Sequence, residues 1–168
     1  MESKISVAFA SIDKEYGLTI PQPIEKEGIR NFITWGEGNT YPEYLYGLFN
    51  DVSTLKTIII GTADYVCGNG IKCLINGLES EINKKGDTMR DLVNLCARDY
   101  LIYGGFAFQV IRNRVGDVAE LYHIDFRYLR SSKKNDVFYY SEEYGKMYAR
   151  TSKVITYPKF VPEARTIP

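Results

Sequence analysis

Histidine and cysteine are scarce in this chain, which limits the chemistry that its side chains can perform. Among 168 residues there is one histidine, His123, and there are three cysteines, Cys67, Cys73 and Cys96. The cysteine count is odd and no CxxC pair occurs, so the spacing indicates neither a disulfide framework nor a zinc site. A lone histidine without a recognisable serine or cysteine nucleophile is poor evidence for a catalytic triad. We therefore expect a protein that is not an enzyme and that holds no metal, cofactor or small-molecule substrate.

An excess of charge of one sign and long hydrophobic runs are missing as well. The 21 Lys and Arg residues balance the 21 Asp and Glu residues, so the formal net charge is zero. Proteins that bind nucleic-acid phosphates tightly usually have a basic excess, and the locally basic stretch 112–134 is more typical of a solvated face. The longest apolar runs, such as Phe106–Ile111, are far shorter than a membrane span. The first residues lack the pattern of a signal peptide, so we expect a protein made in the cytoplasm without membrane contact.

Tyrosine, by contrast, is abundant. The chain contains 14 tyrosines, and 45% of its residues are hydrophobic. A tyrosine has an apolar ring and a polar tip, which suits half-buried sheets and interfaces. This composition and length predict one globular domain with its own core rather than a disordered chain.

One stretch predicts a helix followed by a β-hairpin, and we expect it to form the core. Apolar residues recur at three- and four-residue spacing between Asp87, a good N-cap, and Gly104, which supplies a left-handed residue at the helix end. The chain then alternates with a period of two over Phe106–Ile111, turns at 113–117, and returns over Val118–Ile124. The expected buried face of the helix consists of Met89, Leu92, Val93, Cys96, Tyr100 and Tyr103.

Asp99 interrupts the apolar face of that helix. At about 100° per residue it falls near the middle of the apolar arc, and a buried carboxylate must be paired, hydrogen-bonded to backbone or protonated. We expect a structural Asp99 that holds either a nearby arginine, such as Arg112 or Arg130, or the hairpin backbone. A pair between Asp125 and Arg130 would fix the exit of the chain from the hairpin.

Two further helices are predicted upstream of this core. Pro42 is well placed to begin a helix over Pro42–Phe49, and Asp51 or Ser53 can cap a second helix that ends near Cys67. Glycine in a helix costs up to about 1 kcal/mol relative to alanine, so Gly61 predicts the close approach of another element. The expected buried stripe of the second helix is Leu55, Ile58, Ile59, Thr62, Tyr65 and Val66.

The remaining segments predict turns and short strands. Gly68-Asn69-Gly70 is expected to end the second helix in a tight turn, and it is no dinucleotide fingerprint because it follows a helix. Trp35, the only tryptophan, is expected to close over the core beside a loop, or else to mark a contact site. A polar connector is expected at 76–86. Short strands are predicted at Ile5–Ala10, Ile71–Ile75, Val137–Tyr140, Met147–Thr151 and Val154–Tyr157, with a hairpin turn at 142–146.

Together these elements predict an α+β fold in which two or three helices pack on antiparallel β-hairpins. Residues 1–30 are expected to be an exposed lead-in, and 31–157 a single domain. The proline-containing tail, 158–168, is expected to be extended and frayed unless a partner holds it.

Several motifs, taken in order, resemble the N-terminal portion of a tailed-bacteriophage portal protein. A Trp-Gly-x-x-Asn-x-Tyr-Pro segment, a helix ending in Gly-x-Gly, and an Arg-Asp-Tyr-x-x-Tyr-Gly-Gly-Phe-Ala segment follow one another, and the likeness covers 31–151. No single motif is specific, and the resemblance rests on their order and spacing. The motif residues are Trp35, Gly36, Asn39, Tyr41, Pro42, Gly68, Gly70, Asp99, Tyr100, Gly104, Gly105, Asp125 and Arg130.

The resemblance implies a structural role in virus assembly. Portal proteins form a dodecameric ring at one capsid vertex, and double-stranded DNA passes non-specifically through the central channel. The implied partners are other portal subunits, the terminase motor, which carries the ATPase activity, and the neck and tail proteins. The implied location is the virion, after synthesis in the bacterial cytoplasm. The predicted helices and hairpins match the wing region of the family.

The chain departs from the family in length. Portal proteins continue into stem helices, a clip domain and a crown, and nothing in these 168 residues resembles a long channel-lining helix. The resemblance therefore implies an N-terminal fragment, with the tail leading toward a missing stem and clip, or a truncated gene.

Two other functions are consistent with the sequence. One is a small α+β adaptor domain of prophage origin that binds a protein or peptide through its tyrosines. The other is a nucleic-acid enzyme whose site the sequence does not reveal. Basic residues on one surface with aligned carboxylates would favour the enzyme, and an exposed tyrosine-rich flank would favour assembly.

Overall fold

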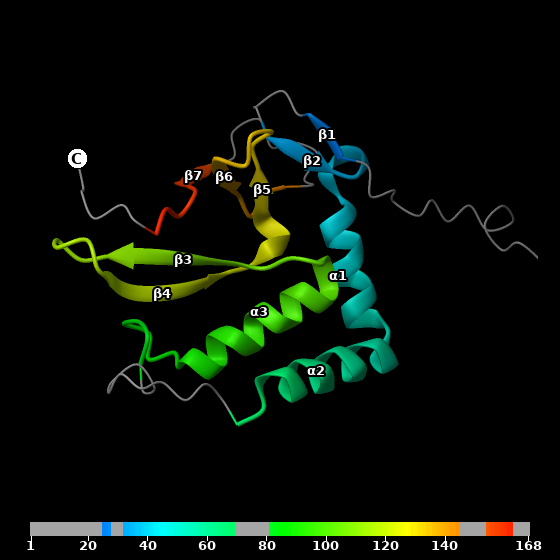
Figure 1. The fold of residues 1–168 in the computed structure, drawn as a ribbon. Coiled ribbons are helices and arrows are strands. Elements are labelled where there is room, and N and C mark those ends of the chain that lie inside the picture. Colours follow the sequence, from blue (N-terminus) through cyan, green and yellow to red (C-terminus); the bar gives the residue numbers. More distant parts are fainter. Residues whose placement is uncertain (1–24, 28–31, 70–80, 145–153, 163–168) are drawn as a thin grey trace, which may run out of the picture.

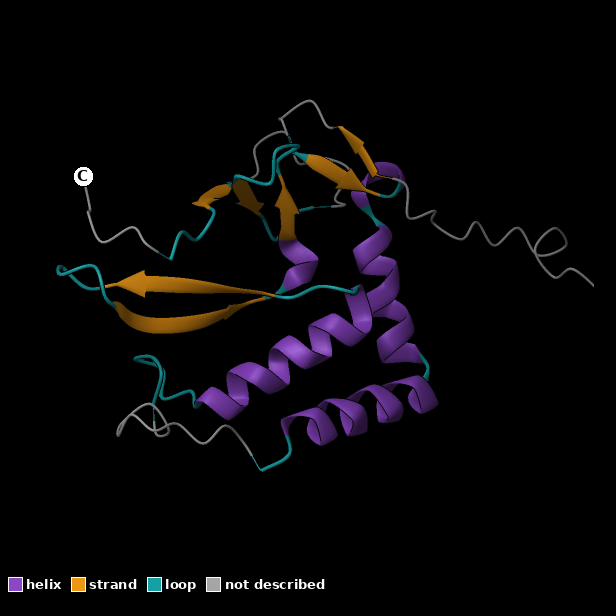
Figure 2. Ribbon diagram, in the orientation of Figure 1, coloured by secondary structure: helices purple, strands orange, loops and turns teal. Residues whose placement is uncertain are grey.

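A computed structural model describes residues 25–27, 32–69, 81–144 and 154–162 of the chain. It confirms the predicted α+β class: three helices lie beside small antiparallel sheets (Figures 1 and 2). No helix among these residues is long and apolar enough to cross a membrane. The elements are β1 (Glu25–Glu27), β2 (Ile33–Trp35), η2 (Glu37–Asn39), α1 (Tyr41–Asp51), α2 (Ser53–Cys67), α3 (Met89–Tyr103), β3 (Ala107–Arg112), β4 (Val118–Ile124), η3 (Phe126–Tyr128), β5 (Leu129–Ser131), β6 (Val137–Tyr140) and β7 (Ile155–Pro158).

Helix α3 begins with a capping box and ends at a glycine. Thr88, not the predicted Asp87, is the N-cap: its hydroxyl accepts from the Asp91 N–H at 3.2 Å, and the Asp91 carboxylate accepts from the Thr88 N–H at 2.9 Å. Asp87 instead accepts a hydrogen bond from the side chain of Asn83 at 2.8 Å. Gly104 has φ of 77°, as predicted for the residue that ends the helix.

The hairpin β3–β4 packs on α3, and this contact forms one buried cluster of the core, to which α1 and α2 also contribute. The strands are antiparallel, with Val110 opposite Leu121, and they confirm the predicted hairpin. Leu121 packs against a buried cluster of Ile82, Leu92 and Cys96. Ile82 lies in the segment predicted to be a polar connector, so one residue of that segment belongs to the core instead.

The buried face of α2 agrees with the prediction at Ile59 and, half-buried, at Leu55, but differs from it elsewhere. Ile59, Ala63 and Cys67 are buried against α3, whereas Ile58, Tyr65 and Val66 are 59%, 87% and 62% exposed. The buried residues form a row at four-residue spacing whose central member is an alanine, which lets two helices approach closely. The close approach expected at the helical glycine of α2 is also wrong, because nothing lies within 4 Å of a methyl group built there.

The buried face of α3 is confirmed only in part. Leu92, Cys96, Asp99 and Tyr103 are buried, but Tyr100 is 58% exposed. Asp99 therefore occupies the apolar arc as predicted, while Tyr100 lies mostly in solvent.

A three-stranded sheet, β5–β6–β7, forms the third part of the fold (Figure 2). β6 and β7 confirm two predicted strands, and β6 pairs with both β5 and β7. Neither β5 nor β1 was predicted, and β1 lies within the expected lead-in. The strands predicted at 5–10, 71–75 and 147–151, with the end of the 142–146 turn, lie outside the described residues.

The domain limits, 1–30, 31–157 and 158–168, remain predictions. The described start of the tail is tied to the rest of the fold at two points. The Lys159 N–H donates to the Asp136 carbonyl at 2.9 Å, and the Arg112 guanidinium donates to the Val161 carbonyl at 2.8 Å.

Candidate functional site

The motif residues that are far apart in the sequence meet around the short helix η3. We call this region the junction; it joins the loop of η2, the end of α3 and the start of β5. The indole ring of Trp35 is its centre, with ring centroids 5.7 Å from Tyr41, 6.5 Å from Tyr103 and 6.1 Å from Phe126. Trp35 is half-buried against these rings, as expected for a ring beside a loop, and its role as a contact site stays a prediction.

The turn after Trp35 places the side chain of Asn39 inside the fold. Gly36 and Asn39 have φ of 79° and 62°, values that glycine and asparagine tolerate better than other residues. The Asn39 side-chain oxygen accepts from the Trp35 N–H at 3.0 Å and from the Arg130 guanidinium. One buried amide thus holds the loop closed and binds a residue 91 positions away.

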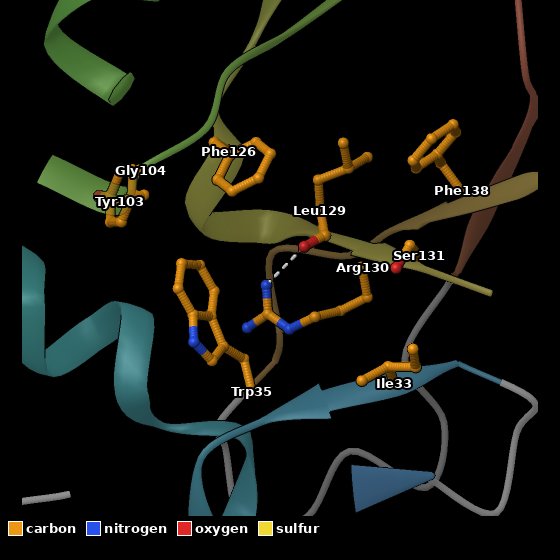
Figure 3. A pocket seen from close by; sticks show the side chains of 9 residues that line it. All are labelled: Ile33, Trp35, Tyr103, Gly104, Phe126, Leu129, Arg130, Ser131 and Phe138. Atoms are coloured by element: carbon orange, nitrogen blue, oxygen red, sulfur yellow. Dashed lines mark hydrogen bonds between the residues drawn. The ribbon is translucent and has the colours of Figure 1, made fainter. Parts of the chain in front are cut away.

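Arg130 is the buried cation of the junction and is only 5% exposed. Besides Asn39, its guanidinium donates to the carbonyl of Arg127 at 2.7 Å. It also donates to the carbonyl of Leu129 at 2.7 Å (Figure 3). It also lies 4.9 Å from the ring of Tyr144. Burial lowers the pKa of Arg130 to about 10, so the group remains charged at neutral pH. Carbonyl dipoles and an aromatic ring, rather than a salt bridge in the described part of the chain, therefore stabilise this charge.

The predicted pair between Asp125 and Arg130 is wrong. Asp125 accepts from the backbone N–H of Arg127 at 2.9 Å and lies 3.3 Å from the guanidinium of that residue. Arg127 in turn lies 4.0 Å from the ring of Tyr46 and 4.2 Å from that of Tyr128. Since Asp125 caps η3 locally, it is not available to the arginine that follows five residues later.

A small pocket opens beside the junction, with a volume of about 260 Å³ (Figure 3). Its wall is mostly aromatic and aliphatic, with Arg130 as its one charged residue. Such a wall can take up an apolar or planar group and, through the guanidinium, a polar oxygen. Its lining residues are Ile33, Trp35, Tyr103, Gly104, Phe126, Leu129, Arg130, Ser131 and Phe138.

Gly105 is required by close packing at the junction. A methyl group built there would lie 2.6 Å from the tip of the Phe126 ring, and that ring is held by Trp35 and Tyr103. We expect Gly105→Ala to lower the free energy of unfolding by about 1–3 kcal/mol, because the ring has to move within a packed cluster. Urea denaturation followed by Trp35 fluorescence measures the change.

Gly61→Ala in α2 is the matched control for that substitution. The same methyl group meets nothing within 4 Å there, and alanine should stabilise the helix by up to about 1 kcal/mol. Equal effects of the two substitutions would contradict the packing argument.

Asp99 is paired with His123 rather than with an arginine. The Nε2 atom of His123 lies 2.8 Å from the Asp99 Oδ2 atom, which also accepts from the Phe126 N–H at 3.1 Å. The expected arginine partner is therefore wrong. The backbone group that Asp99 binds belongs to η3, just after the hairpin, and the hairpin itself contributes the side chain of His123 rather than its backbone. The structure places Asp99 between α3, β4 and η3, at the edge of the junction.

An Asp–His pair also forms two of the three members of a catalytic triad. A triad would also need a nucleophilic side chain beside His123. Cys96 lies one helical turn from Asp99, and burial raises the pKa of its thiol to about 11, which keeps it protonated and a weak nucleophile at neutral pH. No hydrogen bond joins His123 to a hydroxyl or thiol within the described ranges. The pair thus fastens α3 to β4 of the hairpin.

The other motif residues have separate local roles. Pro42 is buried at the start of α1, and Gly68, with φ of 48°, ends α2 as predicted. Tyr100 points to solvent and Gly70 lies outside the described residues. Phe126 and Arg127 belong to the junction but carry no signal in the sequence that would have identified them.

Two further apolar surfaces are exposed among the described residues. One is the outer side of α2, which we call the α2 ridge and define by Ile58, Tyr65 and Val66. The other is an open groove of about 990 Å³ between the hairpin and the chain around β7, which we call the hairpin groove. Its lining includes Phe106, Phe108, Val110, Leu121, Phe138, Tyr157, Phe160 and Val161.

Within the described parts of the chain, no three His, Cys, Asp or Glu side chains are grouped so that they could hold a metal ion. Comparison of the chain with protein-family models, with curated proteins and with solved structures finds no match.

Proposed function

We propose that this chain is the wing-like N-terminal portion of a phage portal subunit, a structural protein of the head–tail connector vertex. The proposal rests first on the order and spacing of the motifs that resemble the portal family. It is supported by the α+β fold of the described residues, which is the class that the resemblance implies for a wing.

The observation that carries the proposal is the convergence of the motifs at the junction. Trp35 and Asn39 come from the first motif, Gly105 from the third, and Arg130 from a later part of the likeness. Here they build one buried polar and aromatic contact across 91 residues, which is the behaviour of residues that specify a common architecture.

The exposed surfaces support an assembly role. The α2 ridge and the hairpin groove present large apolar side chains to solvent, and contiguous apolar surface of this kind marks sites of protein–protein contact. In this proposal the partners are other portal subunits in a ring, and the terminase, neck and tail proteins bind elsewhere. DNA passes through the channel without sequence-specific contact, and the neutral net charge suits a channel that must not retain it.

The test is the mass and shape of the assembly. Light scattering and cryo-electron microscopy of the product of the complete open reading frame should show a large ring with a central channel. The 168-residue chain alone should be a monomer or a small oligomer, because stem and clip contacts are missing from it. A complete product that stays monomeric, or that forms a particle without a channel, would refute the portal assignment.

The alternative is a small protein-binding adaptor domain of prophage origin. The hairpin groove favours it, because an apolar cleft beside the edge of a two-stranded sheet suits an extended peptide. A complete product that is monomeric and binds one phage or host protein tightly, with loss of binding on substitution in the groove, would support the adaptor.

A further inference from the structure

The pocket beside the junction contains a buried cation that forms no ion pair with a carboxylate in the described part of the chain. Arg130 lines this pocket and is only 5% exposed. Burial lowers its pKa to about 10, although Tyr144 and Glu43 act in the opposite direction. The dipoles around the guanidinium therefore compensate for its burial only in part. An anion that enters the pocket would interact with this charge away from bulk water, where the attraction is strong.

The guanidinium of Arg130 has donor capacity left for such an anion. Of its five N–H groups, one donates from Nε to the Asn39 side chain and two donate from Nη1 to the carbonyls of Arg127 and Leu129. The Nη2 atom reaches only the Asn39 carbonyl, at 3.5 Å, which is long for a hydrogen bond. Figure 3 shows the guanidinium turned toward Trp35 and Leu129 in the pocket wall. Nη2 can therefore donate to an oxygen atom of a ligand.

The rest of the pocket wall suits a flat ring. Its aromatic members are Trp35, Tyr103, Phe126 and Phe138. The rings of Trp35 and Phe126 are nearly perpendicular, with an angle of 85° between their planes, and Phe126 also lies against Gly105. Rings that are held in this way can receive another ring edge-to-face or stacked without first being ordered by it.

The size and polarity of the pocket limit the class of ligand. Its volume of about 260 Å³ lies just below the range of about 300–1,000 Å³ that is typical of sites for drug-sized molecules, so it has room for a single substituted ring. Arg130 is the one charged residue of the wall. A phosphate or sulfate ion would have to give up its hydration for one arginine and a mostly apolar surface, which is unfavourable. A carboxylate attached to a ring places its charge at the arginine and its apolar part against the aromatic side chains.

We propose that this pocket binds a small aromatic carboxylate, with the ring against the aromatic wall and one carboxylate oxygen on Nη2 of Arg130. The ligand is held without chemical change. The inference goes beyond the proposed function and applies equally to a portal subunit and to an adaptor domain. Since the ligand contacts Trp35 and Arg130 together, it should also stabilise the junction.

The experiment titrates the 168-residue chain with benzoate and follows the indole N–H signal of Trp35 by nuclear magnetic resonance. Trp35 is the only tryptophan, so its signal is identified without further assignment. Benzoate should shift this signal in a saturable way with a Kd of about 1 mM or lower, which is ordinary for so small a ligand. The urea concentration at the midpoint of unfolding should rise as benzoate is added. A signal that does not saturate at about 10 mM benzoate would overturn the inference.

Two analogues of benzoate separate the charge from the ring in the unaltered protein. Benzamide has nearly the same shape without the charge, and it should bind about 10-fold more weakly because its hydrogen bond to the guanidinium is not charge-assisted on both sides. Acetate has the charge without the ring, and it should cause no saturable shift at the same concentrations. Benzamide that binds as tightly as benzoate, or acetate that does so, would overturn the assignment of an aromatic carboxylate.

Ser131→Phe tests the location of the site. Ser131 is half-buried in the pocket wall, so the added ring should fill the pocket and weaken benzoate binding at least about 10-fold. Thr62→Phe is the matched control, because it adds the same ring on the exposed side of α2, outside the pocket, and should leave benzoate binding unchanged. Circular dichroism checks that both variants are folded, and Ile33→Phe replaces Ser131→Phe if the latter unfolds. Equal binding of benzoate by the pocket variant and the control would place the site elsewhere and overturn the inference.

Discussion

Arg130→Met should lower the free energy of unfolding by about 2–4 kcal/mol. The substitution removes a buried cation whose lowered pKa, about 10, corresponds to a burial cost of about 3 kcal/mol. It also removes the Arg130 donor from the carbonyls of Arg127 and Leu129 and leaves the Asn39 side-chain oxygen with the Trp35 N–H alone. Each buried acceptor left unpaired costs about 1–3 kcal/mol, so the lost hydrogen bonds outweigh the relieved burial cost.

The measurement is urea denaturation at neutral pH, followed by circular dichroism and by the fluorescence of Trp35. Because Trp35 is the only tryptophan and lies in the junction, its emission reports the region that Arg130 holds together. Arg114→Met is the matched control: Arg114 is exposed in the hairpin turn, and its loss should change stability by less than about 0.5 kcal/mol. Equal stability of the two methionine variants would show that Arg130 does not anchor the junction.

Asp99→Ala should lower the free energy of unfolding by a similar amount, about 2–4 kcal/mol. It removes the common acceptor of the His123 ring and the Phe126 N–H, at 2.8 and 3.1 Å, from a site that is 8% exposed. A hydrogen bond to a charged group contributes about 1.5–3 kcal/mol, and the donors left behind are buried or half-buried. The loss should appear as earlier separation of α3 from the hairpin.

The Asp99→Asn variant separates the contribution of the carboxylate charge from that of the size and shape of the side chain. The amide oxygen can still accept from the Phe126 N–H, so this variant should lose roughly half as much stability as the alanine variant. Hydrogen exchange of β4 amides measures the loosening directly, and Asp117→Ala in the exposed hairpin turn serves as the control. If the Asp99→Ala variant melts at the same temperature as the unaltered chain, Asp99 does not stabilise the fold.

The local features of the fold were predictable from the sequence for a physical reason. Helix α3 and the hairpin depend on periodicity, a glycine at the helix end and turn residues, all of which act within a few positions. The burial of Asp99 was predictable in the same way, because helical geometry alone places it in the apolar arc. Its partner was not, since His123 is 24 residues distant and is brought near only when the hairpin folds back.

The face that α2 buries shows where local patterns fail. Three successive isoleucines, 58–60, make the helix apolar around much of its circumference, so several faces are equally plausible. Packing against α3 determines which face is buried. The row that contains the small Ala63 faces α3, and the face that contains Ile58 and Tyr65 is left in solvent. The same packing created the α2 ridge.

The sequence by itself determined the fold class, the helices, the core hairpin and the order of motifs that suggests a portal subunit. Each of these depends on interactions between residues that are close along the chain. Only the tertiary structure decided that Arg130 binds Asn39 rather than Asp125, that Asp99 binds His123, and which surfaces stay exposed. Those outcomes depend on which of several possible partners lies within bonding distance once distant segments pack together. Such contacts between distant residues leave no periodic signal in the sequence.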